Sequence, residues 1–209
     1  MWNNWGFRIL LFVVLSFIFF YTFNAKNPAE KPPSLEYASR LKQERIAKDK
    51  FFKEDGQSPI EKKSEFKGLA YFEIDNTFKV TAELILDKTE QKYAIATTDN
   101  KADTLIKFGV VKFNMGGKLN QLTLFKTENS KLFFLPFRDL TSGKQTYGGG
   151  RYLDVPQSDM LANKVVLDFN LAYQPYCAYN YTYICPVPPI ENALNIEITA
   201  GEKLIEAKK

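Results

Sequence analysis

The chain has 209 residues and a formal charge of +4, and with 45% hydrophobic and 25% charged residues it has the composition of a globular protein. It contains no histidine and two cysteines, which excludes Ser-His-Asp and Cys-His catalysis, histidine-ligated metals, four-cysteine zinc sites and iron–sulfur clusters. We therefore expect no metal site and no cofactor.

The positive charge is spread unevenly along the chain. Residues 1–25 carry +1, residues 26–63 carry +3, and residues 64–209 are neutral, with seventeen basic and seventeen acidic residues. A nucleic-acid-binding domain gathers its basic residues on the reading surface, and the neutral segment has no such cluster. We therefore expect no nucleic-acid partner, and a basic segment beside an apolar one fits a membrane surface better.

Residues 1–25 contain an apolar segment, because Ile9 to Phe23 is free of charge over fifteen residues. As a helix this run spans roughly 22 Å, and its flanking residues extend it toward the roughly 30 Å of a bilayer core. We expect an uncleaved transmembrane anchor. A cleaved signal segment is the first alternative, although Phe23 is too large for the position three before a cut after Ala25, and a buried core helix is the second.

The side of the membrane on which the domain lies is predicted by two features that disagree. Four basic residues closely follow the apolar segment and only Arg8 precedes it, which favours a cytoplasmic domain by the positive-inside rule. Large domains cross membranes largely regardless of such charge, and a pair of cysteines favours an oxidising compartment. We expect a membrane-anchored domain on the extracytoplasmic, periplasmic side, against the charge count.

Residues 26–63 predict a spacer followed by a charged helix. Three prolines between Asn24 and Ser34 give a stiff extended spacer, and Ser34 can cap a helix over 35–52. The weak apolar face of this helix indicates a surface helix lying on the domain, with a partner-binding or membrane-surface helix as the alternative. Three i,i+4 ion pairs are expected along it: Glu36–Arg40, Glu44–Lys48 and Arg45–Asp49.

Residues 64–209 predict an all-β domain, an antiparallel barrel or sandwich of about eight strands. Alternating apolar and polar residues over 78–86 indicate a half-buried strand. The sequence Asn114-Met-Gly-Gly117 predicts a tight hairpin turn. The other short runs that predict strands are 68–75, 92–98, 104–114, 118–126, 131–137, 164–172 and 194–200.

Arginine is rare in this β region, which has fifteen lysines but only Arg138 and Arg151. A planar guanidinium in a lysine-rich domain suggests recognition of a carboxylate or an anionic ligand. The alternative is an internal pair with Asp139, Asp154 or Asp168. The three glycines before Arg151 fit neither a P-loop nor a dinucleotide fingerprint, and they indicate a turn or bulge.

The two cysteines, Cys177 and Cys185, lie in a tyrosine-rich stretch and are eight positions apart. Disulfide geometry needs their Cα atoms within about 7 Å, so the loop must fold back, with Asn180 as a natural turn residue. We expect a structural disulfide; two reduced, packed thiols and a redox or nucleophilic role are the alternatives. The tyrosines at 176, 179, 181 and 183 form either a wall for a ligand or a cover for one end of the barrel.

The longest motifs resemble a bacterial family catalogued as domain of unknown function 1684. The resemblance covers about Tyr37 to Lys203 and departs from the family pattern at Gln174, where asparagine is usual. It implies a compact β-rich domain, often behind a signal or anchor, and it implies no activity. The motifs that carry it are Lys48-Asp49, Ser58-Pro59, Gly68-Leu-Ala-Tyr-Phe72, Phe134-Leu-Pro-Phe-Arg-Asp139, Thr146-Tyr-Gly-Gly-Gly-Arg-Tyr152, Asp168-Phe-Asn-Leu-Ala-Tyr-Gln-Pro-Tyr-Cys-Ala-Tyr179, Cys185-Pro-Val-Pro-Pro-Ile-Glu-Asn192 and Ala200-Gly-Glu-Lys203.

We expect a membrane-tethered binding module for a small or anionic ligand or an envelope component. A hydrolase or lyase that works with the carboxylates of Asp139, Asp168 and Glu202 is one alternative, and an envelope assembly or scaffolding protein is another. The sequence assigns no catalytic residue, and whether the protein is an enzyme stays open. The candidate ligand-binding residues are Arg138, Asp139, Thr146, Tyr147, Arg151, Tyr152, Asp168, Asn170, Tyr173, Asn192 and Glu202.

Overall fold

A computed structural model describes residues 33–126 and 131–205 of the chain. The apolar segment predicted as an anchor lies outside the described residues, as does most of the spacer. Within these two stretches the structure has no helix that is long and apolar enough to cross a membrane. The membrane anchor and the periplasmic location therefore stay predictions.

Helix α2 (Leu35–Glu54) forms where the sequence predicts a helix. Ser34 caps it, because its side chain accepts the N–H of Tyr37, which meets one of the unpaired donors of the first turn. Leu41 and Phe52 are its buried residues. Their burial confirms that the described part of the helix lies on the domain.

The expected ion pairs along the helix are replaced by others. Arg40 pairs with Glu44 at 2.9 Å rather than with Glu36. Lys48 reaches off the helix to Glu202 at 2.5 Å, and Asp49 accepts the N–H of Leu69. The prediction was wrong because Lys48 and Asp49 contact residues outside the helix, and so they do not pair with Glu44 and Arg45 on a solvated helix face.

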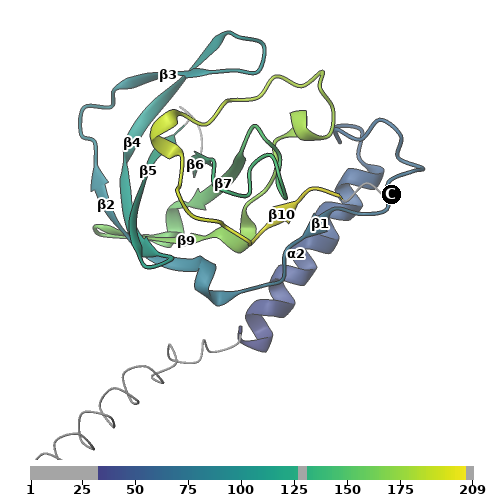
Figure 1. The fold of residues 1–209 in the computed structure, drawn as a ribbon, viewed down its shortest axis with the longest axis horizontal. Helices are drawn as coiled ribbons and strands as arrows, with labels where there is room; N and C mark the ends of the chain where they lie inside the picture. Colours follow the sequence, from purple (N-terminus) through teal and green to yellow (C-terminus); the bar gives the residue numbers. More distant parts are fainter. Residues whose placement is uncertain (1–32, 127–130, 206–209) are drawn as a thin grey trace, which may run out of the picture. The chain divides into compact units, whose positions relative to one another are not determined.

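The remainder is mostly β and forms one curled, eight-stranded antiparallel half-barrel, with the order β7-β6-β5-β4-β2-β9-β8 and β3 paired to β4 (Figure 1). The mostly-β fold with about eight antiparallel strands is confirmed, and the expected barrel or sandwich is a single curled sheet, a half-barrel, whose end strands β7 and β8 do not pair. A separate two-stranded sheet pairs β1 with β10 beside α2. The strands are β1 (Ala70–Tyr71), β2 (Lys79–Leu86), β3 (Lys92–Ala96), β4 (Ala102–Met115), β5 (Lys118–Lys126), β6 (Leu132–Phe137), β7 (Arg151–Pro156), β8 (Met160–Leu161), β9 (Lys164–Asp168) and β10 (Glu202–Lys203).

Short 3₁₀ turns join several of these strands. They are η1 (Asn76–Phe78), η2 (Gln157–Asp159), η3 (Phe169–Leu171), η4 (Tyr176–Ala178) and η5 (Ile190–Asn192). The predicted hairpin between β4 and β5 is confirmed. Gly116 and Gly117 both have positive φ, as a two-residue hairpin turn requires.

The strand predicted over 194–200 is an extended segment that belongs to no named strand, and we call it the C-terminal strap. Its start pairs in parallel with the chain after β6, where the N–H of Leu194 donates to the carbonyl of Arg138 and the N–H of Leu140 donates to the carbonyl of Ile196. Leu194, Ile196, Ile198 and Ala200 alternate into the core and are buried, so the period-2 pattern was real. In Figure 1 the strap is the yellow stretch that runs from η5 to β10 across the curled sheet. The alternating burial therefore accompanies packing across the half-barrel, with backbone pairing only at the start of the strap.

Candidate functional site

Arg151 lies inside the domain and is 0% exposed. Its Nη2 contacts Asp139 Oδ2 at 2.7 Å and donates to the carbonyl of Ile198 at 2.7 Å. Its Nη1 donates to the carbonyls of Ala200 and Glu202. The guanidinium thus supplies the donors that a neighbouring strand would otherwise give to the strap. This is the internal Arg–Asp pair, and Arg151 offers no exposed atom to a ligand.

Asp139 and Thr146 belong to the same closed cluster. Asp139 Oδ1 accepts both the N–H and the hydroxyl of Thr141, at 2.6 and 2.5 Å. The Thr141 hydroxyl lies 2.9 Å from that of Thr146, which is fully buried. These contacts shape the turn that follows β6, and they leave the Asp139 carboxylate fully engaged.

Arg138 and Tyr147 lie at the edge of this turn and are half-buried. Arg138 Nε donates to the carbonyl of Gly149 at a long 3.5 Å. The N–H of Tyr147 donates to Gln174 Oε1 at 3.0 Å. Gln174 Nε2 also reaches the Tyr179 hydroxyl and the Lys203 carbonyl. The glutamine that departs from the family pattern therefore makes three side-chain contacts.

The candidates Asp168, Asn170 and Asn192 each hold two parts of the chain together. Asp168 accepts the Tyr37 hydroxyl at 2.7 Å, which ties α2 to β9. Asn170 exchanges two hydrogen bonds with the backbone of Asp75. Asn192 is 0% exposed and bridges β5 and β6 through three backbone bonds. Buried amides that satisfy backbone groups in this way are structural clamps.

Glu202 is the last of the three carboxylates considered for catalysis, and it too is buried and engaged by protein groups. It is 1% exposed and pairs with Lys48 Nζ. Its Oε2 accepts the N–H of Gln174 at 2.9 Å and the hydroxyl of Tyr179 at 2.8 Å. Asp139, Asp168 and Glu202 are each taken up by separate protein partners, which weighs against a shared catalytic role.

Two of the predicted residues, Tyr152 and Tyr173, line a cavity of about 540 Å³ that we call the aromatic cavity. It lies where α2, β6, β7 and the tyrosine-rich loop meet. Its polar groups are Lys48, Asp154, Cys185 and four tyrosine hydroxyls. The full lining is Lys48, Phe134, Tyr152, Asp154, Tyr173, Pro175, Tyr176, Tyr183, Ile184, Cys185 and Pro186.

The rings of the aromatic cavity stand edge to face. Phe134 and Tyr152 have centroids 4.7 Å apart, Tyr152 and Tyr173 are 5.8 Å apart at 89°, and Tyr176 and Tyr183 are 5.3 Å apart at 89°. This arrangement is the favourable one for aromatic pairs. The wall is therefore held by its own packing and presents ring faces and edges at fixed angles.

Two charged groups of the cavity are compensated within the protein. Tyr173 donates its hydroxyl to Asp154 Oδ2 at 3.0 Å, and burial raises the pKa of Asp154. Lys48 Nζ lies 4.6 Å from the centroid of the Tyr173 ring while it pairs with Glu202. The lining therefore carries little net charge and offers a carboxylate, an ammonium and hydroxyls as hydrogen-bonding groups.

The cysteines lie beside this cavity as free thiols, so the structure does not contain the predicted disulfide. The loop folds back as the spacing required. The N–H of Cys177 donates to the sulfur of Cys185 at 3.3 Å, and η4 turns the chain there. Hydrogen bonding from the Cys177 thiol lowers the pKa of Cys185 to about 7, and the same contact, together with burial, raises the pKa of Cys177.

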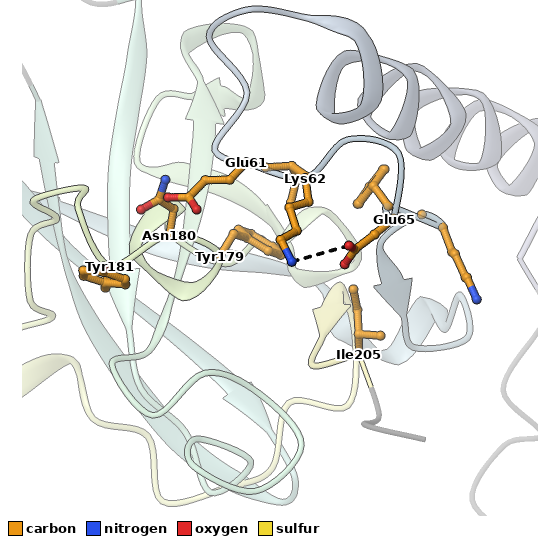
Figure 2. Close-up of a pocket in the computed structure, with 11 residues that line it drawn as sticks. Glu61, Lys62, Glu65, Tyr179, Asn180, Tyr181 and Ile205 are labelled. Atoms are coloured by element: carbon orange, nitrogen blue, oxygen red, sulfur yellow. Dashed lines mark ion pairs between the residues drawn. The ribbon is translucent and has the colours of Figure 1, made fainter. Parts of the chain in front are cut away.

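Two further cavities flank α2 and its loop. One of about 390 Å³ is lined by residues of the segment 60–68, the tip of the tyrosine-rich loop and Ile205 (Figure 2). Its charged side chains include Lys62 and Glu65, which pair with each other at 3.4 Å and are largely solvated. The other cavity, of about 120 Å³, lies under α2 at Arg45. In the stretches 33–126 and 131–205, no three cysteine and acidic side chains gather as metal ligands.

Several residues that line the aromatic cavity are not predicted from the sequence as ligand-binding residues. Tyr176 and Tyr183 were noted only as part of a possible wall, Asp154 as a partner for an arginine, and Lys48 as one half of a helical ion pair. Lys48 was the hardest to find, because nothing local indicates that its side chain turns toward Glu202. The run of tyrosines before Cys185 was the signal that pointed to this cavity.

The fold and the cavities define a class, a single mostly-β half-barrel covered by one helix, with an aromatic cavity where the helix meets the sheet. A family model described as a protein of unknown function, DUF1684, matches residues 64–203, and the chain belongs to this family. The fold is similar to the solution NMR structure of an uncharacterized protein of Haloarcula marismortui, at 36% identity and a TM-score of 0.65, with 81% of this chain and 95% of that chain covered. The curated proteins include no match.

Proposed function

We propose that the protein is a binding module for a small ligand and that the aromatic cavity is its site. The observation that carries this proposal is a cavity of about 540 Å³ lined by five aromatic rings with a few converging polar groups. Small-molecule sites are concave and mostly apolar, with a small number of polar groups that orient the ligand. By contrast, the predicted polar residues around Arg151 are engaged with one another.

The lining supports an uncharged ligand with a flat apolar face and hydroxyl groups, such as a sugar ring. Lys48 already neutralises Glu202, and Asp154 accepts the Tyr173 hydroxyl, so the lining presents no unpaired cation to an anionic ligand. Ring faces bind an apolar face of the ligand, while the Asp154 carboxylate and the Tyr173 hydroxyl can exchange hydrogen bonds with hydroxyl groups. We therefore propose a neutral ligand instead of the anionic ligand that Arg138 and Arg151 suggest in the sequence.

Isothermal titration of the full chain with a panel of neutral mono- and disaccharides tests the proposal. We expect saturable binding that weakens at least fivefold in Tyr183→Ala, since losing a stacked ring costs about 1–3 kcal/mol. Tyr181→Ala is the matched control, because Tyr181 lies on the same loop, is 91% exposed and does not line the aromatic cavity. Absence of binding across the panel, or equal affinity in Tyr183→Ala, would overturn the proposal.

A further inference from the structure

The small cavity under α2 holds three buried polar atoms that lack partners in the described stretches of the chain. They are Nε and Nη2 of Arg45 and the hydroxyl of Tyr71. Both residues line this cavity of about 120 Å³, together with Leu41, Glu44, Lys48, Asn170, Leu171, Ala172 and Glu202. Native proteins rarely leave buried donors unsatisfied, so the cavity is a place where a partner is expected.

The Arg45 guanidinium is fixed in one orientation. Its Nη1 donates to the carbonyl of Phe72 at 3.0 Å, and its Cζ lies 4.4 Å from the centroid of the Tyr71 ring. The two unpartnered nitrogens, Nε and Nη2, form one edge of the planar group. This edge presents two parallel N–H donors, which is the geometry that binds the two oxygens of a carboxylate or phosphate group.

The charge around the cavity also favours an anion. Lys48 and Glu202 neutralise each other, and Glu44 pairs with Arg40. Asp49, the predicted partner of Arg45, accepts the N–H of Leu69 instead. In the described residues Arg45 therefore has no carboxylate within ion-pair distance; burial lowers its pKa, and the charges of Glu73 and Glu202 only partly oppose this. Water can satisfy the two donors, whereas an anion satisfies them and also forms the direct ion pair that Arg45 does not make within the described residues.

We propose that this cavity binds a small oxoanion, with the Nε–Nη2 edge of Arg45 holding two oxygens and the Tyr71 hydroxyl donating a third hydrogen bond. The space equals about four water molecules at roughly 30 Å³ each, which suits an inorganic phosphate or a short monocarboxylate. The site is separate from the aromatic cavity, although Lys48 contributes to the wall of both. It therefore stands or falls independently of the proposed function.

The test is the affinity of the full chain for sodium acetate and for sodium phosphate, each titrated against sodium chloride at matched ionic strength and followed by amide chemical shifts. We expect saturable shifts with acetate or phosphate and none with chloride, and the comparison between the two identifies the oxoanion. Arg45→Lys keeps the charge but removes the planar edge, and should weaken binding at least tenfold. Tyr71→Phe keeps the ring and should weaken it three- to tenfold.

Lys50→Arg is the control, since Lys50 is on the same helix, is exposed and pairs with Glu54, and neither residue lines the cavity. If Arg45→Lys fails to fold, Tyr71→Phe still decides. No saturable response to either oxoanion means that the cavity holds water only, and this overturns the proposal, as does unchanged affinity in both variants. Tyr183→Ala should leave anion affinity unchanged, which separates this result from the test of the aromatic cavity.

Discussion

Arg151 and Arg45 both lie beside aromatic rings, but the protein uses their donors differently. Arg151 sits in the half-barrel, where Asp139 neutralises it and three carbonyls of residues 198–202 occupy both of its Nη groups. Arg45 gives one bond to the Phe72 carbonyl and leaves one edge facing a cavity. Arg151 also leaves its buried Nε without a partner in the described residues, but its countercharge and both Nη groups are satisfied inside the domain, so it stabilises the fold. Arg45 has two neighbouring donors that face a cavity, and it can recognise a group that the chain does not supply.

The largest effect expected from this comparison is that of Arg151→Met. It leaves Asp139 buried without its countercharge and three carbonyls without donors, and should lower the free energy of unfolding by about 3–5 kcal/mol. Urea unfolding measures it. Arg138→Met is the control, because Arg138 is half-buried and makes one long hydrogen bond, so it should cost about 1 kcal/mol or less.

The double variant Arg151→Met with Asp139→Leu sharpens the same point. Replacing both members of a buried ion pair by apolar residues is often neutral or stabilising. Here the carbonyls of Ile198, Ala200 and Glu202 would still lack donors, so the double variant should stay well below the parent protein in stability. Full recovery would show that Arg151 serves Asp139 alone and does not hold the C-terminal strap.

Lys48→Met should have an intermediate effect on the free energy of unfolding, because Lys48 is partly exposed while its ion-pair partner is buried. Its side chain is 29% exposed, but its partner Glu202 is 2% exposed. Glu202 keeps its bonds from Gln174 and Tyr179, so the loss of free energy of unfolding should be about 1–3 kcal/mol. Lys50→Met, at an exposed position, should change it by about 0.5 kcal/mol or less, and an equal cost at both positions would contradict this account.

Much of the fold could be predicted from local pattern. The cap at Ser34, the β4–β5 hairpin and most strands follow from capping, glycine and alternation, which act between near neighbours in the chain. The strap over 194–200 has the alternation of a strand, but the donors to its carbonyls at Ile198 and Ala200 come from Arg151, more than forty positions away. Strand β7 was missed because Arg151 and Asp154 make it look polar, although Arg151 is fully buried.

The candidate site was predicted less well, because it depends on contacts between residues that are distant in the sequence. Arginine scarcity correctly pointed to a special role for Arg151, but whether its donors meet the chain or a ligand depends on tertiary contacts. Tyr152 and Tyr173 were predicted and do line the aromatic cavity. Lys48 and Arg45 looked like halves of helical ion pairs, because sequence spacing shows which residues share a helix face and not what covers that face.

The smallest effect concerns the thiol that lines the aromatic cavity. The pKa of Cys185 is lowered from 9.0 to about 7 by its hydrogen bond from Cys177, while the pKa of Cys177 is raised. Between pH 7 and 9 the unfolded chain therefore binds more protons at Cys185 than the folded one, so stability should rise with pH in this window. Above pH 9 the raised pKa of Cys177 acts in the opposite direction, and stability should fall.

Urea unfolding in a reducing buffer between pH 6 and pH 10 measures this dependence as a difference between the parent protein and Cys185→Ser. The parent should gain about 1 kcal/mol relative to the variant between pH 7 and 9, since the effect is smaller than the full shift because solvent partly screens the pair. Cys177→Ser should reduce the same rise, because a hydroxyl replaces the thiol that donates to Cys185. A flat difference for both variants would mean that the two sulfurs are not coupled, and the cavity wall at Cys185 would then be apolar packing alone.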